Sequence, residues 1–389
     1  MEGGHVPPWK KMTHKKKLIS RTGMPWGWGI LKGFLEILVV AVLLSEGASA
    51  QEAGVIDTFD PLTTPATQTF RASTSVLLAV TQAGNRVVAA GERGIIIYSD
   101  DGGNSWKQAK VPVSVAITNM DFPTGKSGWA VGHGGAVLNS EDGGETWRLQ
   151  MSGKEAAEIE LQAARNGNSK DRRLADAQRL VSDGPDKPLL DVKFWTPQDG
   201  MVVGAYGLAF VTHDGGKTWN SIMGGINNPK GKHLYKILID QQTVFIAGEQ
   251  GALYRGNLTD LKFDELKTPY AGTFFGLVQT PKNALIVFGL RGNAYRSEDQ
   301  GKSWQKIDIG SSITLTSGLV NQRNEICLAD AAGRLLFSRD EGKSFELDIP
   351  PNPIAINGFV SVGDKRIVMA GAAGIRIFEP GKNKKGDGK

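Results

Sequence analysis

Five aspartates of this sequence stand in a setting where carboxylate chemistry could occur. Each lies in the phrase Ser/Thr-x-Asp-x-Gly-x-Ser/Thr-aromatic, and the five are Asp101, Asp142, Asp214, Asp299 and Asp340. Carboxylates are the acid and base of most glycoside hydrolases. A catalytic centre needs only one or two such groups, however, whereas recurrence at a fixed offset in every repeat is typical of a fold element. We therefore predict that these carboxylates accept hydrogen bonds inside tight turns and have a structural role.

The aspartates belong to a longer repeat. Two apolar residues followed by Gly-x-x-Gly recur seven times, with Asp330 in place of the first glycine in one copy. The second glycines stand at positions 94, 135, 207, 251, 292, 333 and 374, so the successive intervals are 41, 72, 44, 41, 41 and 41 residues. Twelve residues after each of the first six stands an aromatic residue: Trp106, Trp147, Trp219, Phe263, Trp304 and Phe345. A period near 41 residues accommodates four short strands, which predicts an all-β, seven-bladed β-propeller with Asp-box turns.

Two repeats depart from this pattern. The fourth has Leu258 where the others have aspartate, and the seventh stops after its third strand, near Phe378. Residues 51–74 contain β-prone pieces at 55–59 and 67–71, so we expect this N-terminal segment to supply the missing strand and close the ring. In the second repeat we expect strands at 117–122, 128–132 and 136–140 and a fourth from Trp147. The propeller would span 51–380, and the polar tail 381–389 is expected to be disordered.

The one long interval between repeats reflects an insertion at 152–188. Helix-forming residues dominate 154–164 and 171–181, which predicts two short helices. Residues 151–190 carry seven basic and seven acidic side chains, so the insertion is amphipathic and neutral rather than a surface for polyanions. It could equally be a decorated loop without a role of its own.

The first 50 residues have the order of a secretory signal. A basic stretch at 10–21 precedes an apolar run at 37–44 and the small residues Ala48, Ser49 and Ala50, so we predict cleavage after Ala50 and a periplasmic protein. The alternative is a retained membrane anchor, but a span needs about 20 apolar residues and this run has eight. From Gln51 onward 38 basic residues face 37 acidic ones, which gives no reason to expect nucleic acid as a partner. Cys327 is the single cysteine and lies in an apolar run, which predicts a buried thiol.

The repeat places its sequence variation on one face of the ring. Because neighbouring strands alternate in direction, the Asp-box turns share a face with the turns between first and second strands. The Gly-x-x-Gly turns and the crossovers between blades share the other face, and there the repeats differ. Aromatic and arginine side chains are enriched in binding hot spots, so we predict a partner-binding set of Arg93, His133, Tyr206, His233, Tyr270, Phe275 and Arg291. The alternative, that these are ordinary solvated turn residues, is equally open.

The sequence contains none of three common enzyme motifs. His133, His213 and His233 lie at no metal-ligand spacing, and the sequence has neither Gly-x-Ser-x-Gly nor a phosphate loop. We therefore expect no metal, no cofactor and no catalytic residue. The rival hypothesis is a sialidase or another glycoside hydrolase, since Asp-boxes are familiar from sialidases, but the sequence Phe70-Arg71-Ala72-Ser73 is not the arginine motif of that family. Seven repeats rather than six also count against it, while a glycan-binding propeller remains open.

With these phrases together, the chain resembles the photosystem II stability/assembly factor family of secreted seven-bladed Asp-box propellers, which has relatives in proteobacteria. The resemblance covers residues 73–378 and includes the stretches 214–219 and 248–251. It implies a non-catalytic monomer that binds membrane-protein subunits during assembly. The sequence departs from the family in the insertion at 152–188 and in having no dense arginine patch, Arg93 and Arg291 being the nearest candidates. The departures leave two kinds of client equally possible: a photosystem subunit, or a subunit of another inner-membrane complex.

Overall fold

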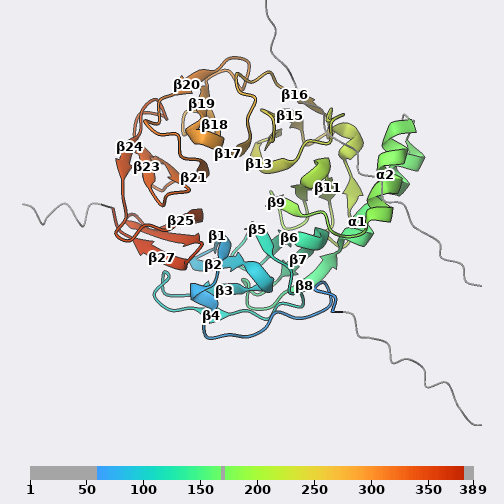
Figure 1. Cartoon of the computed structure of the whole chain (residues 1–389), viewed down its shortest axis with the longest axis horizontal. Helices are drawn as coiled ribbons and strands as arrows, with labels where there is room; N and C mark the ends of the chain where they lie inside the picture. Colours follow the sequence, from blue (N-terminus) through green and yellow to red (C-terminus); the bar gives the residue numbers. More distant parts are fainter. Residues whose placement is uncertain (1–58, 168–170, 381–389) are drawn as a thin grey trace, which may run out of the picture. The chain divides into compact units, whose positions relative to one another are not determined.

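The computed structural model describes residues 59–167 and 171–380, and these form seven antiparallel sheets around a ring (Figure 1). The chain is therefore a seven-bladed β-propeller, mostly β with two helices, as the repeat predicted. The leader 1–50, its cleavage site and the tail 381–389 lie outside the described residues.

The blades follow one another in sequence order, each with its first strand innermost. Blades 1 to 3 contain β1 (Leu77–Ala83), β2 (Arg86–Gly91), β3 (Ile96–Ser99), β4 (Lys107–Gln108); β5 (Ile117–Asp121), β6 (Gly128–Gly132), β7 (Val137–Ser140), β8 (Arg148–Met151); and β9 (Leu189–Phe194), β10 (Gly200–Gly204), β11 (Ala209–Thr212), β12 (Asn220–Ser221). Blades 4 and 5 contain β13 (Leu234–Asp240), β14 (Thr243–Gly248), β15 (Leu253–Asn257), β16 (Phe263–Glu265); and β17 (Phe274–Gln279), β18 (Leu285–Gly289), β19 (Ala294–Ser297), β20 (Gln305–Ile307). Blades 6 and 7 contain β21 (Leu315–Val320), β22 (Ile326–Asp330), β23 (Leu335–Ser338), β24 (Glu346–Asp348); and β25 (Ile356–Val362), β26 (Arg366–Gly371), β27 (Gly374–Phe378).

Apolar side chains between neighbouring blades form the core. The second strand of a blade is covered on both sides, and β6, β10, β18 and β22 are buried at every position. Aromatic rings fill the space between blades 2 and 3, where the ring of Trp129 stacks on Phe194 at 3.6 Å between centroids and Phe194 meets Trp219 edge-on at 6.2 Å. Burial of such large side chains is the main favourable term in the stability of the ring.

The Asp-box turns are closed by their carboxylates. At Asp142 the hydroxyls of Ser140 and Thr146 donate over 2.8 and 2.5 Å, and the amides of Glu145 and Thr146 donate over 2.9 and 3.0 Å. The same contacts from the flanking Ser/Thr residues recur at the other four aspartates. In blade 4, where Leu258 replaces the aspartate, the side chain of Asn257 accepts from the amide of Thr259 at 2.7 Å. One blade therefore folds with a weaker turn.

The Gly-x-x-Gly turns need their glycines for two different reasons. The first glycine lies against the preceding crossover, and a Cβ on Gly91 would stand 2.1 Å from the carbonyl oxygen of Val76. The second glycine has a left-handed backbone, as at Gly94 with φ of +70°. The residue before it is also left-handed, with φ of 56° at Arg93, 56° at Tyr206 and 58° at Arg291, a conformation that disfavours ordinary side chains.

Residues 59–74 supply no strand to the ring, which corrects the expectation for this part of the N-terminal segment. Residues 61–69 run beside the exit of blade 1 instead, where the amide of Ala66 donates to the carbonyl of Val111 at 3.0 Å. Pro61 and Pro65 lack the N–H groups that a strand ladder requires. Residues 51–58 lie outside the described residues, and the seventh sheet has three strands.

Side chains hold blades 7 and 1 together at this seam. Nδ2 of Asn357 donates to the carbonyl of Leu77 at 2.8 Å, and Nη1 of Arg366 donates to the carbonyl of Gly102 at 3.1 Å. Trp106 packs in a cluster that includes Ala370 of blade 7. The seam is thus closed by packing and by a few polar contacts rather than by a shared sheet.

The insertion between blades 2 and 3 forms the two predicted helices, α1 (Gly153–Asn166) and α2 (Asp171–Asp183). A capping box begins α1, in which Ser152 accepts from the amide of Glu155 and Glu155 accepts from the amide of Ser152. The helices pack on each other through Leu161, Ala164 and Ala177. Among the described residues no helix has the length and apolarity to cross a membrane.

Replacing Asp142 with alanine is expected to lower the free energy of unfolding by roughly 1 to 3 kcal/mol at pH 7, because its four donors lose their acceptor. Burial alone would raise the pKa of Asp142, but the hydrogen bonds from Thr146, Ser140 and Glu145 outweigh it, and the pKa lies below its ordinary value. The contribution of a carboxylate with a lowered pKa is complete above its unfolded pKa and is lost as the pH falls through its folded pKa. The stability gap between the wild type and Asp142→Ala should therefore narrow from about pH 5 to pH 2.

Urea unfolding at a series of pH values measures this gap. Glu141→Ala is the matched control, since the side chain of Glu141 is 66% exposed and pairs with Arg148 at the surface; its effect should stay within about 0.5 kcal/mol. A gap that does not change with pH would contradict the assignment of Asp142 as an ionised turn acceptor.

Candidate functional site

The candidate site lies on the face of the ring that carries the Gly-x-x-Gly turns and the crossovers, which we call the turn face. Four residues of the predicted set are exposed in these turns: Arg93, His133, Tyr206 and Arg291. The other three are half-buried in the crossovers or at the start of an inner strand: His233, Tyr270 and Phe275.

Three of the seven come together in one row of rings. Tyr206 meets His233 with 4.9 Å between centroids, and Tyr235 links that pair to the next blade. Tyr235 lies 6.4 Å from His233 and 5.2 Å from Phe275, the latter contact being edge-to-face. We call Tyr206, His233, Tyr235 and Phe275 the aromatic row; it runs across blades 3, 4 and 5.

The other four predicted residues lie apart from this row. Tyr270 donates its hydroxyl to the carbonyl of Leu290 at 2.9 Å and packs near Tyr295, which fixes the crossover between blades 4 and 5. Arg93, His133 and Arg291 stand in the turns of blades 1, 2 and 5, and none of them has a ring contact or an ion pair within the described ranges. The structure therefore does not bring all seven residues into one cluster.

A repeated bulge explains how Tyr235 and Phe275 reach the turn face. The first strand of every blade skips one residue in its pairing with the second strand. In blades 2 and 6 the skipped residue is a threonine whose hydroxyl donates to the next blade, Thr118 to Leu189 and Thr316 to Ile356. In blades 4 and 5 the skipped residues are Tyr235 and Phe275. These two half-buried aromatics present part of their rings on the turn face where blades 2 and 6 have a threonine contact between blades, which favours a binding role.

Tyr235 is a member of the row that the predicted set lacks. It lies two residues after His233 and at the same bulge as Phe275. A comparison of equivalent positions among the repeats could have identified it, because five of the seven skipped positions hold a non-aromatic residue: Leu78, Thr118, Leu190, Thr316 and Asn357. Burial raises the pKa of Tyr235, with a smaller effect from Glu249, so its hydroxyl is neutral at physiological pH.

Beside Tyr206 the turn face opens into a groove of about 850 Å³. One wall is α2, and the opposite wall is the crossover from blade 3 to blade 4, which includes the short helix η5 (Met223–Gly225). Apolar side chains form its floor, among them Leu208, Ile226 and Phe263. Tyr206 is 57% exposed and belongs to both the groove and the aromatic row, so the two form one continuous surface.

Charged side chains surround the mouth of the groove. Arg172 and Arg179 both pair with Asp176 along α2. Lys187 pairs with Asp183 at 3.2 Å, and its ammonium lies 5.7 Å from the centre of the Tyr206 ring. By contrast Lys230, in the crossover, and Lys262, in the turn between β15 and β16, have no ion-pair partner in the part of the chain that the structure describes. Sequence reasoning missed these lysines because they come from two separate segments that line one groove only in the folded chain.

A buried ion pair holds α2 in place against the propeller. The carboxylate of Glu160 on α1 is 2% exposed and accepts from Nε and Nη2 of Arg173 on α2, both at 2.9 Å. Ser221 of β12 donates to the same carboxylate. The guanidinium of Arg173 also lies against Gly224, where a Cβ would stand 2.2 Å from Nη1. This cluster fixes the wall of the groove to blade 3, so the groove is formed in the free protein.

The buried carboxylates of the inner strands are tied to the neighbouring blades. Asp191 accepts from the amide of Ile237 at 2.7 Å and from Nζ of Lys236 at 3.0 Å, and Asn119 donates to it from blade 2. Within residues 59–167 and 171–380 no group of three or more His, Cys, Asp and Glu side chains could hold a metal ion. The buried thiol of Cys327 has a pKa raised to about 12 by burial, which makes it a poor nucleophile. The arrangement is therefore suited to binding an extended ligand through rings, apolar floor and lysines.

Comparison with known proteins gives one family and a shared fold. The family model for the photosynthesis system II assembly factor YCF48 matches residues 104–165 and 175–307, half of the chain. The photosystem II assembly lipoprotein Ycf48 of Synechococcus sp. (strain CC9902) is 29% identical over 136 residues, which cover 34% of this chain and 38% of that protein. The vacuolar protein sorting/targeting protein 10 of Leptosphaeria maculans is 31% identical over 80 residues, 20% of this chain and 5% of that protein. The matched part of the chain thus spans well under half the length of both curated relatives.

The structure of YCF48 bound to a D1 peptide has the same fold. It superposes with a TM-score of 0.60, covering 79% of this chain and 94% of that chain at 16% sequence identity.

Replacing Arg173 with methionine should release α2 from the propeller. The change leaves the Glu160 carboxylate buried without its cation, a situation that costs about 3 to 5 kcal/mol, and local detachment of the helix relieves it. Hydrogen exchange followed by mass spectrometry should show faster exchange across 172–183 with unchanged protection in β10 and β11. Arg172→Met is the matched control, since the side chain of Arg172 is 71% exposed; equal exchange in both variants would contradict the role of the buried pair.

Proposed function

Because the chain belongs to the YCF48 family of photosynthesis system II assembly factors, we propose that it is a non-catalytic assembly or accessory factor that binds an extended segment of a membrane-protein subunit. The observation that carries the proposal is the continuous surface of aromatic row and groove on the turn face. A relative bound to a D1 peptide shows that a member of the family takes a peptide of a membrane protein.

The chemistry of this surface suits a peptide that is both apolar and acidic. The floor of the groove would accept apolar side chains, and the unpaired Lys230 and Lys262 would pair with carboxylates at its mouth. The rings of the row offer flat apolar area at low cost in side-chain entropy. The ring of Tyr206 is 57% exposed and joins the row to the groove, so it is placed to contact both parts of a bound segment.

The compartment is part of the proposal. The signal-like leader 1–50 supports export and action in the periplasm, on the side of the membrane where subunit termini and loops emerge. N-terminal sequencing of the protein recovered from the periplasm should begin at Gln51. Recovery of the intact chain from the cytoplasm would contradict export.

Truncations along the row should weaken client binding in graded steps. Tyr206→Ala and Phe275→Ala are each expected to lower affinity by about 10- to 100-fold, because aromatic anchors carry much of a binding free energy. The client subunit is first captured from detergent-solubilised membranes, and peptides tiling its exported loops and termini are then titrated against each variant by calorimetry.

Lys217→Ala is the matched control for Tyr206→Ala. Lys217 is exposed in the Asp-box turn of the same blade, on the opposite face of the ring. Circular dichroism confirms that each variant is folded. The proposal fails if Lys217→Ala reduces binding while the variants of the row bind as the wild type does.

A further inference from the structure

Within residues 59–167 and 171–380, blade 7 has three strands where the other six blades have four, and its third strand, β27, is an open edge of its sheet. Figure 1 places β27 and the helices of the insertion on opposite sides of the ring. The open edge is therefore separate from the surface proposed above for client binding.

The other blades define what an outer strand contacts. In blades 1, 3 and 4 the amide of the residue that follows the outer strand donates to the carbonyl oxygen of the residue that opens the third strand: Ala109 to Ile96 at 2.9 Å, Ile222 to Ala209 at 3.1 Å and Leu266 to Leu253 at 2.7 Å. Strand register identifies the matching residue of blade 7. Ala370 pairs with Ile375 as Ala90 pairs with Ile96, so the carbonyl of Ile375 faces the open edge.

In blade 7 an arginine takes the place of the missing donor. Nη1 of Arg376 donates to the carbonyl of Ile375 at 2.8 Å and to that of Ala373 at 3.2 Å. Arg376 is exposed and has no carboxylate partner among residues 59–167 and 171–380. A charged side chain on an edge strand keeps the edge from pairing with other chains at random. Here the guanidinium also satisfies the edge carbonyl, so it acts as a cap that another donor can displace.

A complete blade makes a second contact of this kind, through the aromatic residue that precedes its outer strand. This residue packs against the previous blade of the ring. Trp106 of blade 1 packs in a cluster with Ala370 and Ile375 of blade 7, and Trp147 of blade 2 packs in a cluster with Val88 and Tyr98 of blade 1. In the described part of the chain, blade 7 has no aromatic residue before an outer strand, and the matching flank of blade 6 packs instead with Phe378 at the end of β27. By register Phe337 of blade 6 matches Tyr98, since Phe337 pairs with Cys327 as Tyr98 pairs with Val88.

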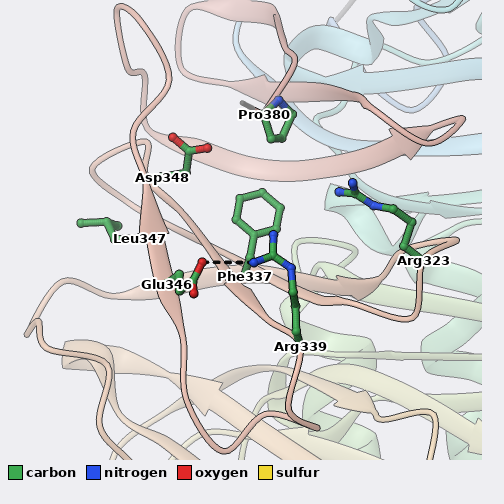
Figure 2. A pocket seen from close by; sticks show the side chains of 7 residues that line it. All are labelled: Arg323, Phe337, Arg339, Glu346, Leu347, Asp348 and Pro380. Atoms are coloured by element: carbon green, nitrogen blue, oxygen red, sulfur yellow. Dashed lines mark hydrogen bonds and ion pairs between the residues drawn. The ribbon is translucent and has the colours of Figure 1, made fainter. Parts of the chain in front are cut away.

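An opening of about 150 Å³ lies at this flank (Figure 2). Phe337 stands at its centre, with Arg339 beside the ring, Arg323 on one side and Pro380 above. Arg339 pairs with Glu346 at 3.2 Å and with Glu325 at 2.7 Å. Guanidinium groups next to an apolar ring suit an aromatic ligand, through stacking and cation–π attraction.

We propose that blade 7 is completed by an extended segment of another polypeptide, which carries an aromatic residue. Its backbone displaces the guanidinium of Arg376 and pairs with the backbone N–H and C=O groups of Ile375 and Ile377, which face the open edge. In an antiparallel ladder these alternate with the N–H and C=O groups of Arg376, which face β26. Its aromatic ring enters the opening beside Phe337. This is β-strand addition, with the six complete blades as the template for both contacts.

The described chain itself does not offer this strand. Residues 61–69 are committed to the exit of blade 1 through Ala66 and Val111. The sequence 381–389 contains four lysines and three glycines and no apolar residue, so it lacks an aromatic for the opening. An external segment with an aromatic side chain meets both requirements.

The probe is a fluorescein-labelled peptide that copies residues 99–110, the Asp-box and outer strand of blade 1, and its control carries Trp106→Ala. Fluorescence anisotropy with the purified full chain should show saturable binding that weakens at least tenfold for the control peptide. Ile377→Pro removes an outward N–H without touching the pairing with β26, and it should abolish binding, whereas Ile377→Val should bind as the wild type does. Arg376→Ala removes the cap and should tighten binding by about threefold to tenfold.

Hydrogen exchange locates the contact, and the amide of Ile377 should become protected only when the peptide is present. Protection of that amide in the free chain, at any concentration, would overturn the proposal, since the leader or a second copy would then already fill the edge. Equal binding by Ile377→Pro and Ile377→Val, or weaker binding by Arg376→Ala, would also overturn it. Tyr206→Ala should leave probe binding unchanged, so failure of the client-binding proposal and failure of this one are distinguishable.

Discussion

The packing of each blade against the blade before it is the constraint on which this structure depends. The aromatic residue after each Asp-box lies in the cluster between two blades, as Trp147 does against Tyr98. An isolated four-stranded sheet would leave that surface in water, so a blade gains its stability from its neighbours. The Asp-box carboxylates hold the turn that aims the aromatic, which is why their recurrence serves the fold and not catalysis. Each blade needs a neighbour on both sides, so blades 7 and 1 must also pack together although they lie at opposite ends of the repeat. At this seam the structure departs from the four-stranded pattern of the other blades.

The number of blades and their strand order could be predicted from spacing alone, because the phrase recurs seven times and the second glycine is kept in every copy. Gly91 and Gly94 show the close backbone approaches that these glycines permit. The two helices of the insertion followed from helix-forming composition. Closure of the ring could not be predicted in this way. The β-prone piece at 67–71 has the composition of a strand, but Pro61 and Pro65 and the contact of Ala66 with Val111 direct the segment along blade 1.

The candidate site was predictable only in part. Alternation of strand direction assigned Tyr206, His233 and Phe275 to the turn face, and the structure joins them in one row. Tyr235 completes the row through a bulge, a shift of register that apolar periodicity does not reveal. The groove depends on how α2 is held against blade 3, and the buried pair of Glu160 and Arg173 holds it there, together with Ser221 of β12. Those residues are 13 positions apart on separate helices, so no local pattern links them.

The open edge of β27 shows how a turn that is one residue shorter can alter a surface. In blade 1 five residues separate the paired Ala90 and Ile96, whereas in blade 7 four separate Ala370 and Ile375, and Gly371 pairs directly with Gly374. An alignment of the repeats by their glycines would therefore match Arg376 with Ile96 and place its backbone outward. The observed register turns its backbone inward and leaves the guanidinium free to reach the carbonyl of Ile375. The shorter turn thus places a charged cap on β27, in the one blade of the described chain whose third strand has no outer strand beside it.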